Sequence, residues 1–237
     1  MRYSARHLFY SFNSALLLFI ASACDTTIKT DEAVISDAVF EKKITMAPLD
    51  TLTIDTAKSE ITWIGAKMTG RHNGRFYIQS GKLYRNKKLL AGGTIVLNMA
   101  ALRSDDKGID AETNAKLTRQ LRSADFFDVE HYPAAVFELT AVVPIDSSGQ
   151  QAATRKYDER HVGNPTHRIT GNLSIKGQTK SVSFPARVTF EDNLLHARAN
   201  FNLDRTKWGL VYRSDESLGN QTIYPEVNIG LNIVATP

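Results

Sequence analysis

The sequence predicts an all-β fold: an antiparallel meander of at least eight strands, either closed as a barrel or folded as a sandwich. Apolar and polar residues alternate over eight separate segments, which is the period of a half-buried strand. Short polar turns join neighbouring segments, such as Lys176-Gly177-Gln178 and Glu191-Asp192-Asn193. The chain has 237 residues, 42% hydrophobic and 23% charged. That composition excludes a disordered or collagen-like protein.

The first 23 residues have the organisation of an export signal. Arg2 and Arg6 form a positive start, and residues 15–21 form an apolar stretch that is too short to span a bilayer. Ala21-Ser22-Ala23 is a pattern that a secretory peptidase could cut, so plain secretion is one interpretation. We therefore expect residues 1–23 to be a signal peptide.

The single cysteine favours a second interpretation. Residues 20–24, ending in Cys24, resemble the lipobox of bacterial lipoproteins, although Ala21 stands where a larger aliphatic residue is usual. This resemblance implies that the Cys24 thiol is acylated and becomes the new N-terminus. Several acyl chains together would hold the protein stably on a membrane, whereas one chain binds only marginally.

Residues 24–47 are expected to be the lipidated cysteine followed by a flexible tether, because residues 25–47 are rich in acidic and small residues. A short helix over residues 31–41 is left open. The tether would lead to one domain over residues 48–237. The formal charge of +4 falls to +2 once Arg2 and Arg6 are removed, which predicts no nucleic-acid partner.

The domain contains the eight alternating segments and one helix. The strands are expected, in chain order, over residues 59–65, 74–78, 94–99, 135–141, 167–175, 182–190, 195–203 and 227–233. Asp110 is a suitable N-cap for a helix over residues 110–122, with Leu117 and Leu121 on one face. Residues 147–166 are predicted to be an exposed hairpin loop, and residues 205–219 a long connection.

The usual catalytic and metal-binding motifs are absent from the sequence. There is no phosphate-binding loop, nucleophile elbow, dinucleotide fingerprint or zinc-protease motif. The histidines are scattered, and the pairs Asp105/Asp106 and Asp125/Asp128 are interpreted as caps, turns or solvated charges. We therefore expect no catalytic residue, no metal and no cofactor, and a protein that is not an enzyme.

Three segments carry a family resemblance. Residues 121–133 followed by Phe137, the hairpin over residues 171–180, and residues 204–209 with Tyr212 and Ser214 resemble, in order and spacing, the signatures of the YceI-like family. The resemblance covers residues 50–236. It implies a lipocalin-like, eight-stranded antiparallel β-barrel with one amphipathic helix packed on it. It also implies an elongated apolar cavity for polyisoprenoid, quinone-type or other long-chain lipids, in proteins exported to the bacterial periplasm.

The inward stripes of the predicted strands are apolar and aromatic, with no ionisable residue at their centres. Eight strands is also the size at which a barrel can hold one small ligand. The candidate ligand-binding residues are Trp63, Phe76, Ile95, Leu97, Phe126, Phe137, Leu173, Phe184, Phe201 and Trp208. The alternative is that these side chains simply fill the core. Arg205 is expected either to meet a pyrophosphate or quinone head group or to hold the turn at Asp204.

Three functions remain open. The first, which we expect, is an isoprenoid-binding lipoprotein of the bacterial envelope, exported, lipid-anchored and facing the periplasm. The second is a structural or stress-related envelope module with a filled barrel and a protein partner. The third is an enzyme that acts on a lipid head group, which would need a convergent polar site at the barrel mouth. A hollow interior favours the first and a packed one the second. A homodimer is left open.

Overall fold

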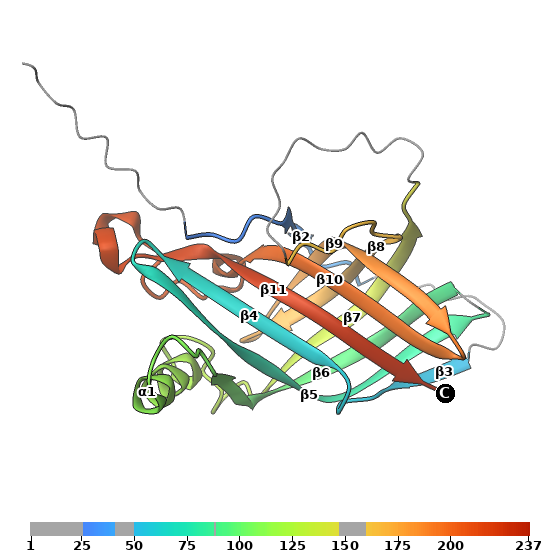
Figure 1. The fold of residues 1–237 in the computed structure, drawn as a ribbon, viewed down its shortest axis with the longest axis horizontal. Helices are drawn as coiled ribbons and strands as arrows, with labels where there is room; N and C mark the ends of the chain where they lie inside the picture. The colour runs from blue at the N-terminus through green and yellow to red at the C-terminus, as the bar shows by residue number, and fades with distance from the viewer. Residues whose placement is uncertain (1–25, 41–49, 88, 147–159) are drawn as a thin grey trace, which may run out of the picture.

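The computed structural model describes residues 26–40, 50–87, 89–146 and 160–237. Eight of its strands form a closed antiparallel ring, in which each strand pairs with the next and β11 returns to β4 (Figure 1). They are β4 (Glu60–Lys67), β5 (Gly70–Asn86), β6 (Leu89–Ser104), β7 (Ala134–Pro144), β8 (His167–Ile175), β9 (Gln178–Glu191), β10 (Leu194–Asp204) and β11 (Ile223–Thr236). Each of the eight predicted strands is present, and the barrel, not the sandwich, is the architecture.

The two hairpin turns expected from the sequence are present with the backbone that such turns require. Lys176 and Gly177 between β8 and β9 have φ of 48° and 73°, and Asp192 and Asn193 between β9 and β10 have φ of 48° and 67°. Two successive residues in the left-handed region make a turn whose twist matches that of the strands it joins. Asn, Asp and Gly adopt this region most readily.

One end of the barrel is closed by apolar packing. The strand β3 (Asp50–Ile54) pairs with the far part of β5 and with the end of β11. Leu52, Leu195 and Ala235 belong to the buried core there, and all three are fully buried. We call this the closed end; it carries the C-terminus and lies on the right in Figure 1. The sequence analysis missed β3, although it lies inside the expected domain, because five residues with only Leu52 and Ile54 apolar show too little alternation.

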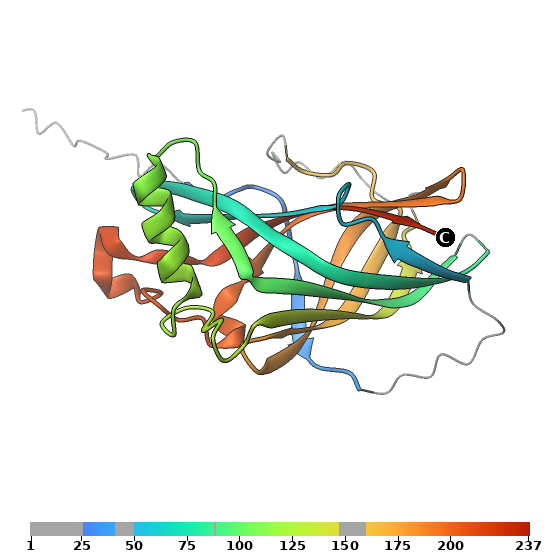
Figure 2. The ribbon, with the colours of Figure 1, turned by 90° about the horizontal axis from the view of Figure 1, so that it is seen from below.

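The opposite end carries the helices, and we call it the mouth end (Figure 2). The helix α1 (Ala111–Arg122) begins where predicted, since Asp110 caps it by accepting a hydrogen bond from the Thr113 backbone N–H at 2.7 Å. Its apolar face buries Leu121 against the barrel. Two short 3₁₀ helices, η2 (Arg205–Trp208) and η3 (Glu216–Gln221), lie within and just beyond the long connection. The turn between β4 and β5 is at the same end.

Residues 26–40, the N-terminal segment, complete the barrel wall. β9 and β10 pair directly only over residues 187–191 and 194–198, near the closed end. Nearer the mouth the two strands separate, and the N-terminal segment occupies the seam between them. There β1 (Asp31–Glu32) runs parallel to β10, and β2 (Val34–Asp37) runs antiparallel to β9. The helix left open over residues 31–41 is therefore wrong, because the backbone of residues 31–37 pairs with the free edges of β9 and β10.

Asparagine side chains on the outside of the barrel hold the N-terminal segment in place. Asn202 Nδ2 donates to the Ile28 carbonyl and to Glu32 Oε1, both at 2.9 Å. Asn172 donates to the Val39 carbonyl at 2.7 Å and accepts from the Val39 N–H at 3.0 Å, as a neighbouring strand would. The expected tether is thus attached to the barrel over residues 26–40.

Several expectations fall outside the described residues. These are the signal peptide over residues 1–23, Cys24, residues 41–47 of the tether, and residues 147–159 of the predicted hairpin loop. In the part of the chain that the structure describes, no helix has the length and apolar character needed to cross a bilayer.

Candidate ligand-binding cavity

The barrel is hollow. It encloses a cavity of about 670 Å³, and every strand from β4 to β11 contributes to its wall. β11 shows how the sequence produces this wall: Val227, Ile229, Leu231 and Ile233 line the cavity, while the polar residues between them point away. This is the period-two alternation that the sequence analysis assigned to half-buried strands.

Large and small side chains divide the cavity along its length. Phe184 and Phe201 face each other across β9 and β10 and stack with ring centroids 4.2 Å apart. Towards the closed end the same two strands present Ala186, Ala197 and Ala199, all of which line the cavity. Because alanine side chains end at Cβ, they leave room beyond the aromatic pair.

Two glycines allow aromatic rings to lie flat against the wall. A Cβ on Gly74 would lie 2.6 Å from the Trp63 ring, and a Cβ on Gly171 would lie 2.3 Å from the Phe137 ring. Both distances are shorter than any real carbon contact, so neither glycine can be replaced without moving a ring. The buried Nε1–H of Trp63 has no partner among the described residues, a donor that an oxygen on a ligand would satisfy.

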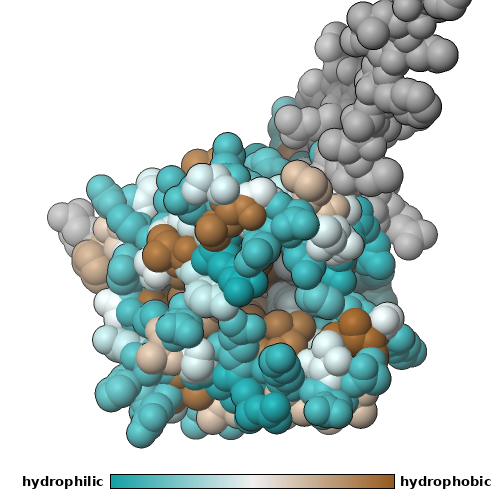
Figure 3. All heavy atoms as spheres, turned by 90° about the vertical axis from the view of Figure 1, so that its left-hand side faces the viewer, coloured by the Kyte–Doolittle hydropathy of each residue, from teal (hydrophilic) through white to brown (hydrophobic). Residues whose placement is uncertain are grey.

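The cavity opens at the mouth end. The lining residues there include Thr69, Arg213, Asn220 and Gln221, which are exposed, whereas the lining residue Ile233 near the closed end is 4% exposed. Figure 3 looks onto the mouth end and shows a hollow near its centre, bordered by hydrophilic residues with apolar groups beside them. A ligand would therefore enter between α1, η3 and the β4–β5 turn.

Arg205 organises the mouth. It is 3% exposed, and its guanidinium lies 5.3 Å from the centre of the Phe126 ring. It donates to the carbonyls of Leu210, Tyr212, Ile223 and Tyr224, which joins the η2–η3 connection to β11. Burial lowers the pKa of Arg205, against the opposing effect of nearby carboxylates. Of the two roles expected for Arg205, these hydrogen bonds show the structural one, which is to hold the chain that follows Asp204.

A second contact ties the helix to the same connection. Gln120 on α1 donates to the Tyr212 hydroxyl at 2.6 Å. On the other side of the mouth, the fully buried Trp208 donates from Nε1 to the Leu173 carbonyl at 2.8 Å. Trp208 therefore has both a structural hydrogen bond and a place on the cavity wall.

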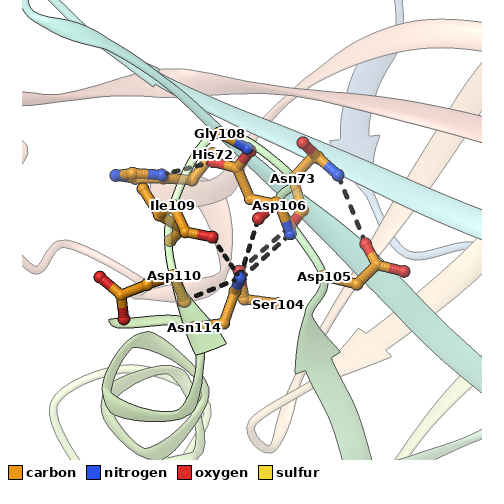
Figure 4. Close-up of polar contacts among 9 residues, drawn as sticks. All are labelled: His72, Asn73, Ser104, Asp105, Asp106, Gly108, Ile109, Asp110 and Asn114. Carbon is orange, nitrogen blue, oxygen red and sulfur yellow. Dashed lines mark hydrogen bonds and ion pairs between the residues drawn. The ribbon is translucent and has the colours of Figure 1, made fainter. Parts of the chain in front are cut away.

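A polar network fixes α1 against β5 and β6 (Figure 4). Asn114 lies at its centre: its Oδ1 accepts from Ser104 Oγ at 2.6 Å and from the Asp106 N–H at 3.0 Å, and its Nδ2 donates to the Asp106 carbonyl at 2.8 Å. His72, which lines the mouth, lies 2.8 Å from Asp106 Oδ2 through its Nδ1. The network thus positions one side of the opening.

The Asp106 carboxylate is stabilised in its charged form. Burial acts to raise its pKa, but the hydrogen bonds from His72 and from the Gly108 backbone N–H outweigh that effect, so the pKa lies below its ordinary value. Asp105 accepts from Arg75 Nε at 2.7 Å, and Asp128 lies 2.8 Å from His131 Nδ1. These aspartates have the structural partners expected of caps and surface charges.

The charged residues along the cavity wall are all cationic: Lys67, Arg198, Arg205 and Arg213. No aspartate or glutamate belongs to the described lining. Among the described residues, no three His, Cys, Asp or Glu side chains come together in a way that could hold a metal ion. The arrangement suits a long apolar molecule with a neutral or anionic polar end.

All ten candidate ligand-binding residues line the cavity. They are Trp63, Phe76, Ile95, Leu97, Phe126, Phe137, Leu173, Phe184, Phe201 and Trp208. The sequence analysis missed the polar residues of the mouth, such as Thr69, Gln120 and Asn220, because they lie in turns and helices where the period of two is lost. The sequence offered one signal for the position of the mouth, which was the clustering of Trp208, Tyr212 and Arg213 in one long connection.

Comparison with known proteins agrees with this architecture. Residues 52–235 match the YceI-like domain. UPF0312 proteins of Azotobacter vinelandii and Pseudomonas putida strain W619 are 36% and 34% identical over 74 and 95 residues, covering 31% and 39% of this chain. The matched segments span only 30% and 41% of those relatives' own lengths.

Two solved structures share the fold. BcnA of Burkholderia cenocepacia superposes with a TM-score of 0.57 at 21% identity, covering 77% of this chain and 99% of BcnA. A polyisoprenoid-binding domain from Saccharophagus degradans, implicated in plant cell wall breakdown, superposes with a TM-score of 0.53 at 12% identity, covering 80% and 99%. With the domain match spanning most of the chain, this protein belongs to the YceI-like family.

Proposed function

We propose that this protein binds a long-chain lipid, of the polyprenyl or quinone type, inside its barrel, and that it acts as a binding or carrier protein and not as an enzyme. The observation that carries the proposal is the hollow apolar interior of about 670 Å³, with aromatic rings along the wall and no carboxylate among the described residues that line it. A structural module would fill this space with its own side chains, as protein interiors normally do. The polyisoprenoid named for the Saccharophagus domain supports the same ligand class.

Desolvation of the ligand would drive binding. Burying one CH₂ group contributes about 0.8 kcal/mol, so a five-carbon isoprene unit contributes roughly 3 to 4 kcal/mol before costs. A few units in a preformed cavity would offset the losses of association and reach about micromolar affinity or better. The polar residues of the mouth would orient the head group. Lys67 and Arg213 favour a head group that is anionic or rich in acceptor oxygens.

The proposal includes an envelope lipoprotein that faces the periplasm and is anchored through acylated Cys24. Its support is the sequence pattern of residues 1–23, which is typical of an export signal, and the position of the chain's single cysteine directly after it. Changing Cys24→Ala should release the protein from the membrane fraction. A variant that stays membrane-bound after a high-salt wash would remove the anchor from the proposal.

The experiment that tests lipid binding is native mass spectrometry with organic extraction on the full chain, purified from its own host. A co-purifying isoprenoid or quinone-type mass is the expected result. Phe184→Glu should lose that mass, because it places a charge in the apolar wall, while the matched change Phe40→Glu at a residue 78% exposed should keep it. A ligand-free protein that takes up no long-chain lipid on titration would instead favour the structural or protein-binding module.

A further inference from the structure

We propose that the mouth end is a docking face for an anionic lipid bilayer, so that the cavity opens directly against the membrane. This inference rests on the proposed lipid-binding function and adds an orientation to it. Three observations at this end point the same way: exposed apolar side chains beside the opening, cations without carboxylate partners, and the place where the N-terminal segment meets the barrel.

The apolar side chains come from separate elements at the mouth end. Met68 lies in the β4–β5 turn, Val211 follows η2, and Leu218 lies in η3; they are 49%, 59% and 44% exposed. A single exposed apolar residue is ordinary on a protein surface. Three on the segments next to an apolar opening can insert together into the interface of a bilayer, as the apolar face of an interfacial helix does.

Three cations around the opening, Lys67, Arg71 and Arg213, have no carboxylate partner within the described residues, whereas Lys207 of η2 pairs with Asp204 at 3.4 Å. Lys67 and Arg213 line the opening, and Arg71 lies beside it and donates only to the backbone carbonyls of Thr26 and Thr27. Four acids at this end lie at the starts of two helices: Asp215 and Glu216 at η3, and Asp110 and Glu112 at α1. Asp215 caps the Ser217 N–H at 2.9 Å and Asp110 caps the Thr113 N–H at 2.7 Å. Each lysine or arginine near an anionic bilayer strengthens binding roughly fivefold.

The N-terminal segment begins at the mouth end. Thr26 Oγ1 donates to the Lys67 carbonyl at 2.6 Å, and the Thr26 carbonyl accepts from Arg71. These contacts fix the start of the segment beside the β4–β5 turn. Two residues of chain span at most about 7 Å, so a lipid on Cys24 would enter the bilayer next to this turn.

Together these features give the ligand a path without an aqueous step. With the mouth against the headgroups, a lipid tail can move from the hydrocarbon of the bilayer to the apolar cavity while its head group stays among the cations of the rim. The unfavourable exposure of a free tail to water is then avoided.

The orientation can be measured on the full chain. Leu218→Cys is labelled with an environment-sensitive NBD dye and reconstituted in vesicles of phosphatidylethanolamine and phosphatidylglycerol at about 7:3, with spin-labelled lipid as quencher. Leu89→Cys is the matched control, because Leu89 is 62% exposed at the start of β6, beside the β5–β6 turn at the closed end. We expect the spin-labelled lipid to lower the NBD fluorescence at position 218 at least twofold and to leave the fluorescence at position 89 unchanged. Equal quenching at the two positions would overturn the proposal.

An acylated Cys24 has no free thiol and cannot take the dye. Because Cys24 is the single cysteine of the unchanged chain, labelling of that chain tests separately whether Cys24 is acylated. Replacing phosphatidylglycerol by phosphatidylcholine should reduce the quenching at position 218, and no reduction would refute the electrostatic part of the docking face.

A transfer assay separates docking from lipid binding. The combined change Met68→Glu and Leu218→Glu should slow transfer of a dansyl-labelled farnesyl chain between vesicles at least tenfold, and leave the amount bound at equilibrium unchanged. Leu89→Glu should transfer at the normal rate. Unchanged transfer by the double variant would contradict the docking face. A protein that binds no labelled chain at all would defeat the proposed function, while the quenching at position 218 would still report on docking.

Discussion

The alanines beyond the aromatic pair predict how long a ligand the barrel accepts. Val227 and Ile233 are six residue steps apart on β11 and both line the cavity, a separation of roughly 20 Å along the strand, or about 16 Å along the barrel axis at a tilt near 40°. One isoprene unit adds four C–C bonds of about 1.5 Å in zigzag, or roughly 5 Å. This stretch of the wall therefore fits about three isoprene units.

Ala197→Phe would place a phenyl ring at the deep end of that stretch. The ring has about the bulk of one isoprene unit, so the longest chain that fits should become one unit shorter. A chain that loses one buried unit loses about 3 to 4 kcal/mol of binding free energy, which is two to three orders of magnitude in Kd. Shorter chains, which do not reach position 197, should bind as before.

The assay is native mass spectrometry of the full chain with an equimolar mixture of prenols of increasing length. Ala134→Phe, at an exposed position of β7, is the matched control and should keep the normal length profile. Because the new ring enters a hollow, the free energy of unfolding should fall by no more than the roughly 1 to 3 kcal/mol of an overpacked core. A folded Ala197→Phe protein with an unchanged length profile would refute the reasoning.

Three further predictions concern stability. Arg205→Lys keeps the charge but loses the fork that serves four carbonyls, so denaturant unfolding should show a loss of about 2 kcal/mol or more; an equal midpoint would contradict this. Because folding lowers the pKa of Asp106, its carboxylate adds to the free energy of unfolding above the ordinary pKa near 4. This stabilisation is lost as the pH falls through the pKa of Asp106 in the folded protein. The stability difference between the unchanged chain and Asp106→Asn should therefore shrink between about pH 5 and pH 2, and a constant difference would count against it. Gly171→Ala should cost roughly 1 to 3 kcal/mol because its Cβ would meet the Phe137 ring, whereas Gly163→Ala, with open space around it, should cost far less, and equal effects would be inconsistent with the packing.

The barrel strands and the cavity wall were predictable because both follow from alternation. When a strand has one polar face and one apolar face, the alternation of its residues identifies the side chains that point inward. The residues of β11 from Val227 to Ile233 are an example. All ten candidate wall residues came from such stripes or from the family signatures. Alternation alone did not predict that the interior is hollow, which only the family resemblance implied, because a hollow depends on how alanines such as Ala186 and Ala197 face the opposite wall.

The N-terminal segment was not predictable from local patterns. Thr30 bonds to the Asn200 carbonyl across 170 positions of sequence, and no local period reports such a pairing. One signal was available in hindsight. Asn172, Asn200, Asn202 and Asn228 occupy strand positions where asparagine is unfavourable, and all four are buried. Buried amides need partners, and the N-terminal segment and the amides themselves supply them.

The seam between β9 and β10 has a consequence for any shortened form of this protein. The family match begins at residue 52, but the wall uses residues 31–37. A fragment starting near residue 48 would leave unpaired backbone groups on β9 at 180–183 and on β10 at 201–202, which are two open sheet edges. Such edges readily recruit a strand from a second molecule. A dimer or aggregate formed only by that fragment, and not by a chain starting at residue 26, would therefore report a missing piece of wall and not a native assembly.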